Sequence, residues 1–317
     1  MITPLMQIKD LKKYFKTPKG WLHAVDGVNL KINKGTTLGL VGESGCGKTT
    51  LGRVIIRLLE PTSGEVLYNG ENIFNYNSKQ VKEMRKKMQI IFQDPYASLN
   101  PRMTVSDIIG EPLLVNKGII NKKQRRKRIE ELMEIVGLDK RSLYLFPHEL
   151  DGGRRQRIGI AKALSLNPEF IVCDEPVSAL DVSIQAQILN LLMDLQCQLG
   201  HTYVFISHNL SVVKHISNEI VVMYLGQCVE RVSSSELFIN PMHPYTKALL
   251  KAIPIPDLAY RGRKREIIKG EVLSPINPGP GCRFAQRCPY SKKECTEQTL
   301  TLKEIEKGHF VACLLYK

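Results

Sequence analysis

The sequence has no hydrophobic run long enough to cross a membrane. None of the apolar stretches in its 317 residues approaches the roughly 20 residues that a membrane-spanning helix needs. Residues 1–5 also lack the pattern of a signal peptide. We therefore expect a cytoplasmic protein, in which the 8 cysteines are not expected to form disulfides.

Acidic residues are in short supply. The chain has 31 Asp and Glu against 45 Lys and Arg, which leaves a net charge of +14. Such a balance suits an anionic partner, whether nucleic acid, a membrane surface or an acidic protein face. At 317 residues the chain is longer than one small core needs, so we expect one large domain with an appendage, or two domains.

Residues 42–49 match the phosphate-loop pattern G-x-x-x-x-G-K-[ST]. An apolar stretch at residues 37–41 predicts a buried strand before the loop, and the spacing of apolar residues at 50–59 predicts a helix after it. Glycines let successive backbone N–H groups point at a phosphate, and the helix start adds partial positive charge. Lys48 can bridge the β- and γ-phosphates, and the Thr49 hydroxyl can bind Mg²⁺. The residues expected at the nucleotide are Gly42, Glu43, Ser44, Gly45, Cys46, Gly47, Lys48, Thr49 and Thr50.

Further apolar stretches at residues 88–92, 170–175 and 203–208 read as strands that alternate with helices. Such alternation predicts a parallel sheet wound in βαβ units, whose polar C-terminal ends meet at the phosphate loop. Residues 6–33 instead alternate apolar and polar side chains, which predicts an antiparallel subsheet. The polar residues at the ends of the later strands are Gln93, Asp174, Glu175 and His208.

Two other stretches are ambiguous from the residues alone. Tyr14 and Phe15 lie upstream of the phosphate loop, where an aromatic ring either stacks on adenine or belongs to the core. Residues 121–128 form a basic run, for which we favour a solvated helix face. After Val229 the chain becomes rich in Pro and Gly, so we expect a domain boundary near Ser233.

Residues 150–157, read with the phosphate loop, Gln93 and the acids at 174–175, resemble the motifs of ATP-binding cassette (ABC) ATPases, whose signature is L-S-G-G-Q. Their order and spacing match over residues 6–230. The resemblance implies an α/β P-loop ABC core at residues 1–232. That core would contain the parallel sheet, the antiparallel subsheet and a helical subdomain at about 97–165. Residues 233–317 would form a small cysteine-containing extension.

Finer motifs are similar to those of the dipeptide and oligopeptide permease ATPases. They occur in and after the phosphate loop, after Gln93, and around the Asp181 loop. Others open the C-terminal extension at residues 243–249 and recur around its cysteines. The Cys46-Gly47 variant resembles the F-type subunit, one of two non-identical ATPases.

The resemblance implies a role for each matched residue. Phe15 would stack on adenine, with Tyr14 as the fallback. Thr49, Gln93 and Asp174 would hold Mg²⁺. Glu175 would polarise the attacking water, and His208 would contact the γ-phosphate.

The signature departs from the family pattern at Asp151 and Arg154, where Ser and Gln are usual. In this family each ATP lies between one chain's phosphate loop and the other chain's signature, here residues Asp151, Gly152, Gly153 and Arg154. A carboxylate near a phosphate is repulsive unless Arg154 or Arg155 neutralises it. Asp151 can equally be an N-cap for the following helix. A smaller departure is Asn209, where Asp is usual.

Four cysteines crowd together near the C-terminus. Four thiols in so short a stretch suggest one metal site with four sulfur ligands, although unligated thiols are the alternative. The spacing does not separate Zn²⁺ from a [4Fe–4S] cluster, and the resemblance favours the cluster. The expected ligands are Cys282, Cys288, Cys295 and Cys313.

The resemblance implies the ATP-hydrolysing subunit of a peptide importer, bound to the cytoplasmic face of the membrane. Its partners would be a second, non-identical ATPase, two transmembrane permease subunits and an extracytoplasmic peptide-binding protein. A soluble ABC ATPase acting on nucleic acid is the alternative that the net charge of +14 suggests. A metal or redox module with a vestigial nucleotide site is a third, which the intact Lys48, Glu175 and His208 disfavour.

Overall fold

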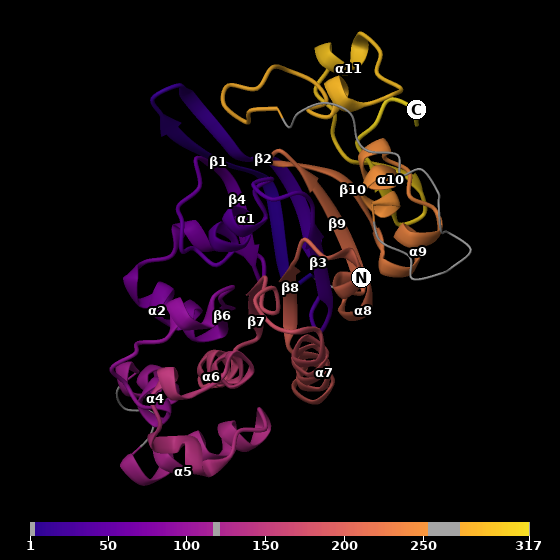
Figure 1. Ribbon diagram of the computed structural model, residues 1–317. Helices are drawn as coiled ribbons and strands as arrows, with labels where there is room; N and C mark the ends of the chain where they lie inside the picture. Colours follow the sequence, from indigo (N-terminus) through magenta and orange to yellow (C-terminus); the bar gives the residue numbers. More distant parts are fainter. Residues whose placement is uncertain (1–3, 117–120, 253–272, 317) are drawn as a thin grey trace, which may run out of the picture. The chain divides into compact units, whose positions relative to one another are not determined.

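The computed structural model describes residues 4–116, 121–252 and 273–316 (Figure 1). By their contacts these residues form two compact units. The first unit comprises the described parts of residues 1–33, 37–74 and 206–317, and the second comprises those of 34–36 and 75–205. No helix among the described residues is long and apolar enough to span a bilayer.

The first unit contains an antiparallel subsheet, which the alternating pattern predicts within residues 6–33. Two of its strands lie there, and the other two lie within residues 63–72, which that prediction did not include. Its four strands lie in the order β2-β1-β4-β5. The hairpin between β1 and β2 is closed by the Thr17 hydroxyl, which donates to the carbonyl of Gly20 (2.7 Å). The strands are β1 (Met6–Thr17), β2 (Gly20–Ile32), β4 (Ser63–Tyr68) and β5 (Glu71–Asn72).

A second group of strands in the first unit lies in the order β11-β12-β10-β9-β3. β3 (Thr37–Val41) pairs in parallel with β9 (Glu219–Tyr224), and β10 (Gln227–Ser233) pairs antiparallel with β9. The C-terminal strands β11 (Lys303–Glu306) and β12 (His309–Val311) extend this group through β10. The predicted boundary near residue 233 falls between β10 and the next helix, and the domain boundaries stay a prediction.

The helical elements of the first unit connect these strands. α8 contacts β3, and α9 contacts both β9 and β10. The helices are α1 (Lys48–Ile55), α8 (Leu210–Ile216), α9 (Ser234–Ile239), α10 (Pro244–Lys251) and α11 (Glu294–Glu297), with 3-10 turns η1 (Ile73–Asn75) and η5 (Ala285–Arg287).

The second unit contains three strands in the order β8-β7-β6, of which β6 and β7 are parallel. They are β6 (Met88–Ile91), β7 (Phe170–Asp174) and β8 (Thr202–Ile206). α4 packs on α5 and α6 in its helical part. The helical elements are α2 (Ser78–Lys87), α3 (Pro95–Ser98), α4 (Val105–Val115), α5 (Lys122–Ile135), α6 (Gly152–Leu164) and α7 (Val182–Leu199), with 3-10 turns η2 (Lys140–Tyr144) and η3 (Pro147–Glu149).

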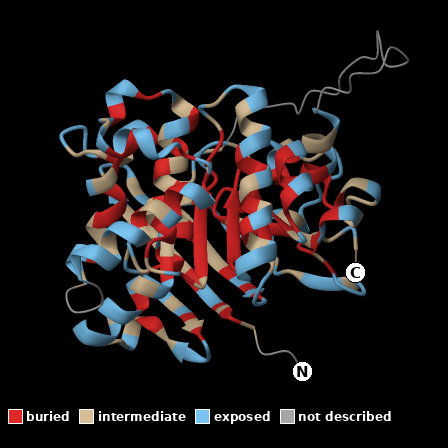
Figure 2. Ribbon diagram, turned by 90° about the horizontal axis from the view of Figure 1, so that it is seen from below, coloured by how far each residue is buried: buried red, intermediate tan, exposed pale blue. Residues whose placement is uncertain are grey.

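Burial follows the parallel strands. Every residue of β3, β7 and β8 is buried, and Figure 2 shows buried residues concentrated along the strands. A strand covered on both faces needs a continuous apolar run rather than an alternating one, which is the pattern from which the sequence predicted these strands.

The basic run at residues 121–128 lies at the start of α5, where most of its side chains are exposed. The helix begins at a capping box in which the Asn121 side chain accepts from the backbone N–H of Gln124 (2.9 Å) and the Gln124 side chain accepts from that of Asn121 (3.0 Å). Arg126 pairs with Glu130 one turn later (3.0 Å). The run is therefore a solvated, ion-paired helix face, as expected.

A buried carboxylate joins the C-terminal strands to the rest of the first unit. Glu230 on β10 is fully buried, and it accepts from the N–H groups of Met242 (2.7 Å) and His243 (2.9 Å). The imidazole Nε2 of His309 on β12 lies 2.7 Å from the same carboxylate. The Glu230 side chain thus binds two parts of the first unit at once: the backbone just before α10, and the C-terminal hairpin of β11 and β12.

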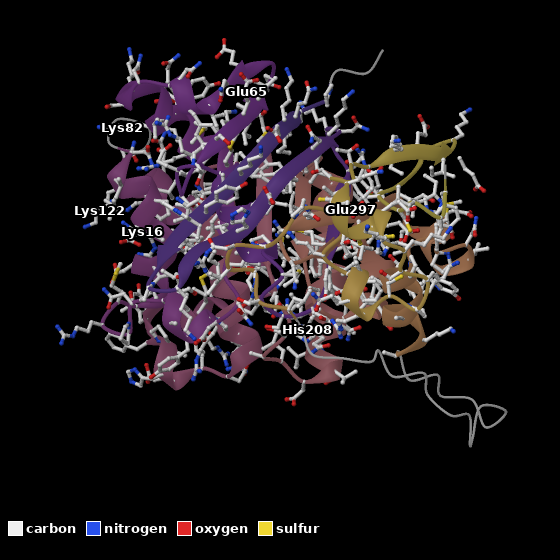
Figure 3. The ribbon with its side chains drawn as sticks, turned by 90° about the horizontal axis from the view of Figure 1, so that it is seen from above. Lys16, Glu65, Lys82, Lys122, His208 and Glu297 are labelled. Atoms are coloured by element: carbon white, nitrogen blue, oxygen red, sulfur yellow. The ribbon has the colours of Figure 1, made fainter. Side chains whose placement is uncertain are left out.

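We predict that Glu230→Ala lowers the free energy of unfolding by about 3–5 kcal/mol, because it leaves buried polar groups without their partner. The midpoint of urea unfolding measures this change. Glu65 is the matched control, since its ion pair with Lys9 is half exposed (3.9 Å; Figure 3 labels Glu65). Glu65→Ala should cost less than about 0.5 kcal/mol, and equal losses for the two variants would contradict this role of Glu230.

Candidate nucleotide site

The phosphate loop connects β3 to α1, as the sequence predicts, and two of its glycines cannot be replaced without a clash. Gly47, the N-cap of α1, has a φ of 103°, and a Cβ there would lie 1.9 Å from the carbonyl oxygen of Ala24. Gly42 has a φ of 152°, and its Cβ would lie 2.2 Å from the carbonyl oxygen of Met223. The left-handed backbone and the close neighbours both demand glycine.

Lys48 folds back over this loop. Its amino group donates to the carbonyls of Gly42 (2.8 Å) and Glu43 (2.9 Å), and the residue is buried. A buried ammonium at a helix N-terminus makes the loop strongly attractive to anions. Burial raises the pKa of the neighbouring Cys46 thiol although Lys48 opposes the shift, so this cysteine stays neutral and unreactive.

Tyr14 is engaged within the first unit. Its ring stacks on the His23 imidazole, with 3.8 Å between ring centroids, and its hydroxyl donates to Asp26. Burial and this bond to Asp26 raise the pKa of Tyr14. The Phe15 side chain has no polar atom to form such a bond, and the Lys13 amino group lies 4.9 Å from the centroid of its ring. Of the two candidates, Phe15 is therefore better suited to stack on a base.

Asp26 belongs to a network around Tyr14. It accepts from Tyr14 and from the guanidinium of Arg283, and His23 lies 3.4 Å away. Burial alone would raise the pKa of Asp26, but the bonds from Tyr14, Arg283 and His23 lower it below its usual value. The carboxylate is thus ionised, and its bond to Arg283 joins the antiparallel subsheet to the C-terminal segment, by which we mean the described residues of 244–316.

In the second unit the structure brings Gln93 and Glu175 together. Asp174 ends β7 and is buried, and Glu175 follows it. The amide of Gln93 donates to the Glu175 carboxylate (2.9 Å). Glu175 has a φ of 47°, a conformation that is rare outside glycine and that often occurs at functional sites.

The signature motif begins α6. Asp151 is its N-cap, and its carboxylate accepts from the backbone N–H of Arg154 (2.8 Å). The same carboxylate lies 3.3 Å from the Arg154 guanidinium. Asp151 therefore performs both functions that the sequence left open, the cap and the ion pair, and its partner is Arg154 rather than Arg155, whose guanidinium donates to the carbonyl of Pro147.

His208 follows β8 and precedes α8 in the first unit (labelled in Figure 3). Asn209, the second departure from the family pattern, is the N-cap of α8, and its side chain accepts from the N–H of Ser211 (3.0 Å). Asn and Asp are about equally good N-cap residues, so this change preserves the cap.

The four C-terminal cysteines surround one small cavity of about 20 Å³, which has room for one water-sized sphere. Burial raises the pKa values of the Cys282, Cys288 and Cys313 thiols, that of Cys282 to about 11. Within the described residues, however, no three His, Cys, Asp or Glu side chains are placed to hold a single metal ion. The four cysteines thus line one cavity, but in the described residues they are not placed as the ligands of one metal ion that the sequence predicts.

Sequence reasoning assigned no role to three residues that contact this region. Tyr245 on α10 and Arg287 in η5 both bond Glu43 of the phosphate loop, and Arg283 bonds Asp26. All three lie in motifs that resemble the permease group, which was the available signal. Each of the three residues is more than 200 positions away in sequence from the residue that it contacts, so motif spacing could not reveal these contacts.

Comparisons with known proteins agree with this geometry. A family model described as ABC transporter matches residues 25–178, and one for the C-terminal region of oligopeptide/dipeptide transporters matches residues 229–295. Among solved structures, the ATP-binding cassette MJ0796 bound to ADP and Pi superposes with a TM-score of 0.67 at 29% identity, covering 72% of this chain and 98% of that one. CbiO1 from Clostridium perfringens has the same TM-score at 26% identity, covering 75% and 92%. Fold and loop thus define an ATP-binding cassette.

Curated relatives narrow the class. The oligopeptide transport ATP-binding protein OppF of Bacillus subtilis is 53% identical over 315 residues, covering 99% of this chain and 97% of OppF. AppF, an oligopeptide transport ATP-binding protein of the same organism, is 50% identical over 323 residues, covering 98% and 97%. The chain belongs to the ABC transporter family, in its group of oligopeptide transport ATP-binding proteins.

Proposed function

We propose that this chain drives peptide import by hydrolysing ATP for a membrane permease. The observation that carries the proposal is the identity of 50–53% with oligopeptide transport ATP-binding proteins, which extends through the C-terminal segment. The chain is an ABC-type ATPase, and its reaction requires ATP and Mg²⁺. The relatives are transport proteins, which favours import over the nucleic-acid alternative.

In the proposed reaction the phosphate loop and Lys48 bind the β- and γ-phosphates, and Phe15 stacks on adenine. Thr49, Gln93 and Asp174 are the proposed groups for Mg²⁺. Hard oxygen ligands suit this cation, and the buried Asp174 supplies a carboxylate.

Glu175 is the proposed acceptor of the proton from the attacking water, and His208 the proposed γ-phosphate contact. The bond from Gln93 supports this role of Glu175, because it fixes the carboxylate in one orientation. Fixed orientation matters, since the base must lie within hydrogen-bond reach of the water.

The proposed partners are two transmembrane permease subunits, an extracytoplasmic peptide-binding protein and a second, non-identical ATPase. The chain would then bind to the cytoplasmic face of the membrane. Tyr96, which is exposed on α3 after Gln93 and stacks with Arg155, is a suitable contact for the permease.

We predict that Glu175→Gln lowers ATP turnover by about 10²-fold or more while ATP still binds, because the amide keeps the shape but cannot accept the proton. Steady-state phosphate release by the assembled transporter measures turnover. Glu130→Gln, which alters only an exposed ion pair on α5, is the matched control and should leave turnover unchanged. If Glu175→Gln hydrolyses ATP at the wild-type rate, Glu175 is not the base.

The two ATP sites of the proposed heterodimer should be unequal. This chain offers Asp151, with Gly152, Gly153 and Arg154, to the partner's ATP, and a carboxylate there weakens phosphate binding. The ion pair with Arg154 reduces that effect, although both side chains are more than half exposed and solvent screens the pair. Most turnover would therefore use this chain's own Lys48 and Glu175.

For Asp151→Ser we expect hydrolysis at the partner's site to rise or stay unchanged, because serine keeps the N-cap and removes the charge. The measurement uses a transporter in which Glu175→Gln blocks the ATP site built on this chain's phosphate loop, so that phosphate release reports the partner's site. Asp151→Asn is the control that keeps both shape and cap. A large fall in both variants would mean that the carboxylate is required, and the asymmetry would be wrong.

The four C-terminal thiols are the proposed ligands of a [4Fe–4S] cluster, with Zn²⁺ as the alternative. Their common cavity supports the set. A single tetrahedral Zn²⁺ needs sulfurs about 2.3 Å from one point, and the described cysteines are not placed to hold one ion. The preference for the cluster rests on the family resemblance of the cysteine motifs. Such a centre cross-links the segment, and its positive charge would lower the raised thiol pKa values.

Cys288→Ser should lower the iron, sulfide or zinc content of protein purified without oxygen and destabilise residues 280–317, because metal binding stabilises the segment. Elemental analysis and limited proteolysis report the two effects. Cys197→Ser, an exposed cysteine on α7, is the control. Metal-free wild-type protein with four alkylatable thiols and a protease-resistant segment would rule out the site.

A further inference from the structure

The phosphate loop carries an acid, Glu43, directly after Gly42. A carboxylate in a loop that binds a polyphosphate opposes that binding, because like charges repel more strongly where protein replaces water. The structure shows how this charge is compensated, and the compensation comes from the C-terminal segment of the same unit.

Arg287 neutralises the carboxylate of Glu43. Its Nη1 lies 3.1 Å from Oε2 and its Nη2 lies 3.4 Å from Oε1, so the pair is bidentate. Nη1 also donates to the Tyr224 hydroxyl (3.1 Å). The Arg287 side chain is only 7% exposed, and Glu43 is 26% exposed, so solvent screens this pair less than a surface pair.

Tyr245 holds the backbone of the same residue. Its hydroxyl accepts from the N–H of Glu43 (2.9 Å), and its ring packs against Tyr224 and Phe284 at centroid distances of 4.6 and 5.4 Å. Tyr245 is fully buried. With the bond from Lys48 to its carbonyl, Glu43 has a partner at its N–H, its carbonyl and its carboxylate.

We propose that Arg287 and Tyr245 are positioning residues of the nucleotide site: Arg287 cancels the Glu43 charge that would repel the phosphates, and Tyr245 fixes the start of the loop. The C-terminal segment thereby sets the affinity for the phosphate part of the nucleotide. This inference rests on the proposed ATP site. It holds whatever occupies the cysteine cavity, since neither side chain is a proposed ligand there.

The test compares wild type, Arg287→Ala, Glu43→Gln and the double variant. Equilibrium titration of each full-length chain with MgATP and with adenosine gives the dissociation constants. Arg287→Ala should weaken MgATP binding at least 10-fold, because Glu43 is left uncompensated, and change adenosine binding less than 3-fold. The double variant should recover to within 3-fold of Glu43→Gln, since the repelling charge is gone.

A purely structural role for Arg287 predicts no such recovery, because removing Glu43 cannot restore lost packing. If the double variant binds MgATP as weakly as Arg287→Ala, or if Arg287→Ala binds like wild type, the proposal is wrong. Failure of wild type to bind MgATP at all would instead contradict the proposed function, so the two failures are distinguishable.

Tyr245→Phe tests the backbone contact separately, because it keeps the ring and removes only the hydroxyl. It should weaken MgATP binding several-fold with little change in adenosine binding. Lys293→Ala is the control on the same segment, since it removes only the exposed ion pair with Glu297 (3.7 Å; Figure 3 labels Glu297). Equal effects of these two variants would overturn the role of Tyr245.

Discussion

The proposed nucleotide site of this chain depends on the contacts that Tyr245 and Arg287 make with Glu43. A phosphate loop must present its N–H groups to the phosphates, which requires a positive φ at Gly42, Gly45 and Gly47, where there is no side chain to anchor the backbone. Here two anchors come from outside the loop: the Tyr245 hydroxyl accepts from the N–H of Glu43, and Arg287 pairs with its carboxylate. Within the loop, Lys48 donates to the Glu43 carbonyl. The C-terminal segment is therefore part of the machinery of the first unit.

The same segment also reaches the region expected to hold the base. Arg283 bonds Asp26, which in turn fixes Tyr14, and Tyr14 precedes the proposed base-stacking residue Phe15. Arg283 and Arg287 each adjoin a cysteine of the shared cavity. The part of the chain that carries the cysteines therefore also carries both of these ion pairs.

Much of this could be predicted from sequence because the signals are local. The strand before the loop, the β1–β2 hairpin and the cap at Asp151 each depend on residues close together in the chain. The pairing of β1 with β4 joins residues more than 50 positions apart, and the alternating pattern did not predict it. The sequence could not decide between cap and ion pair at Asp151, because one carboxylate has two oxygens and the structure uses both. Nor could it find Tyr245 or Arg287, whose partner lies 202 and 244 residues away and is chosen by tertiary packing.

Hydrogen exchange at the Glu43 amide tests most directly whether the C-terminal segment holds the loop. In wild type this amide should exchange slowly, because its N–H is bonded to the hydroxyl of the buried Tyr245. In Tyr245→Phe, protection at Glu43 should fall at least 10-fold while the amides of β3 keep theirs. Equal protection at Glu43 in both proteins would contradict the account.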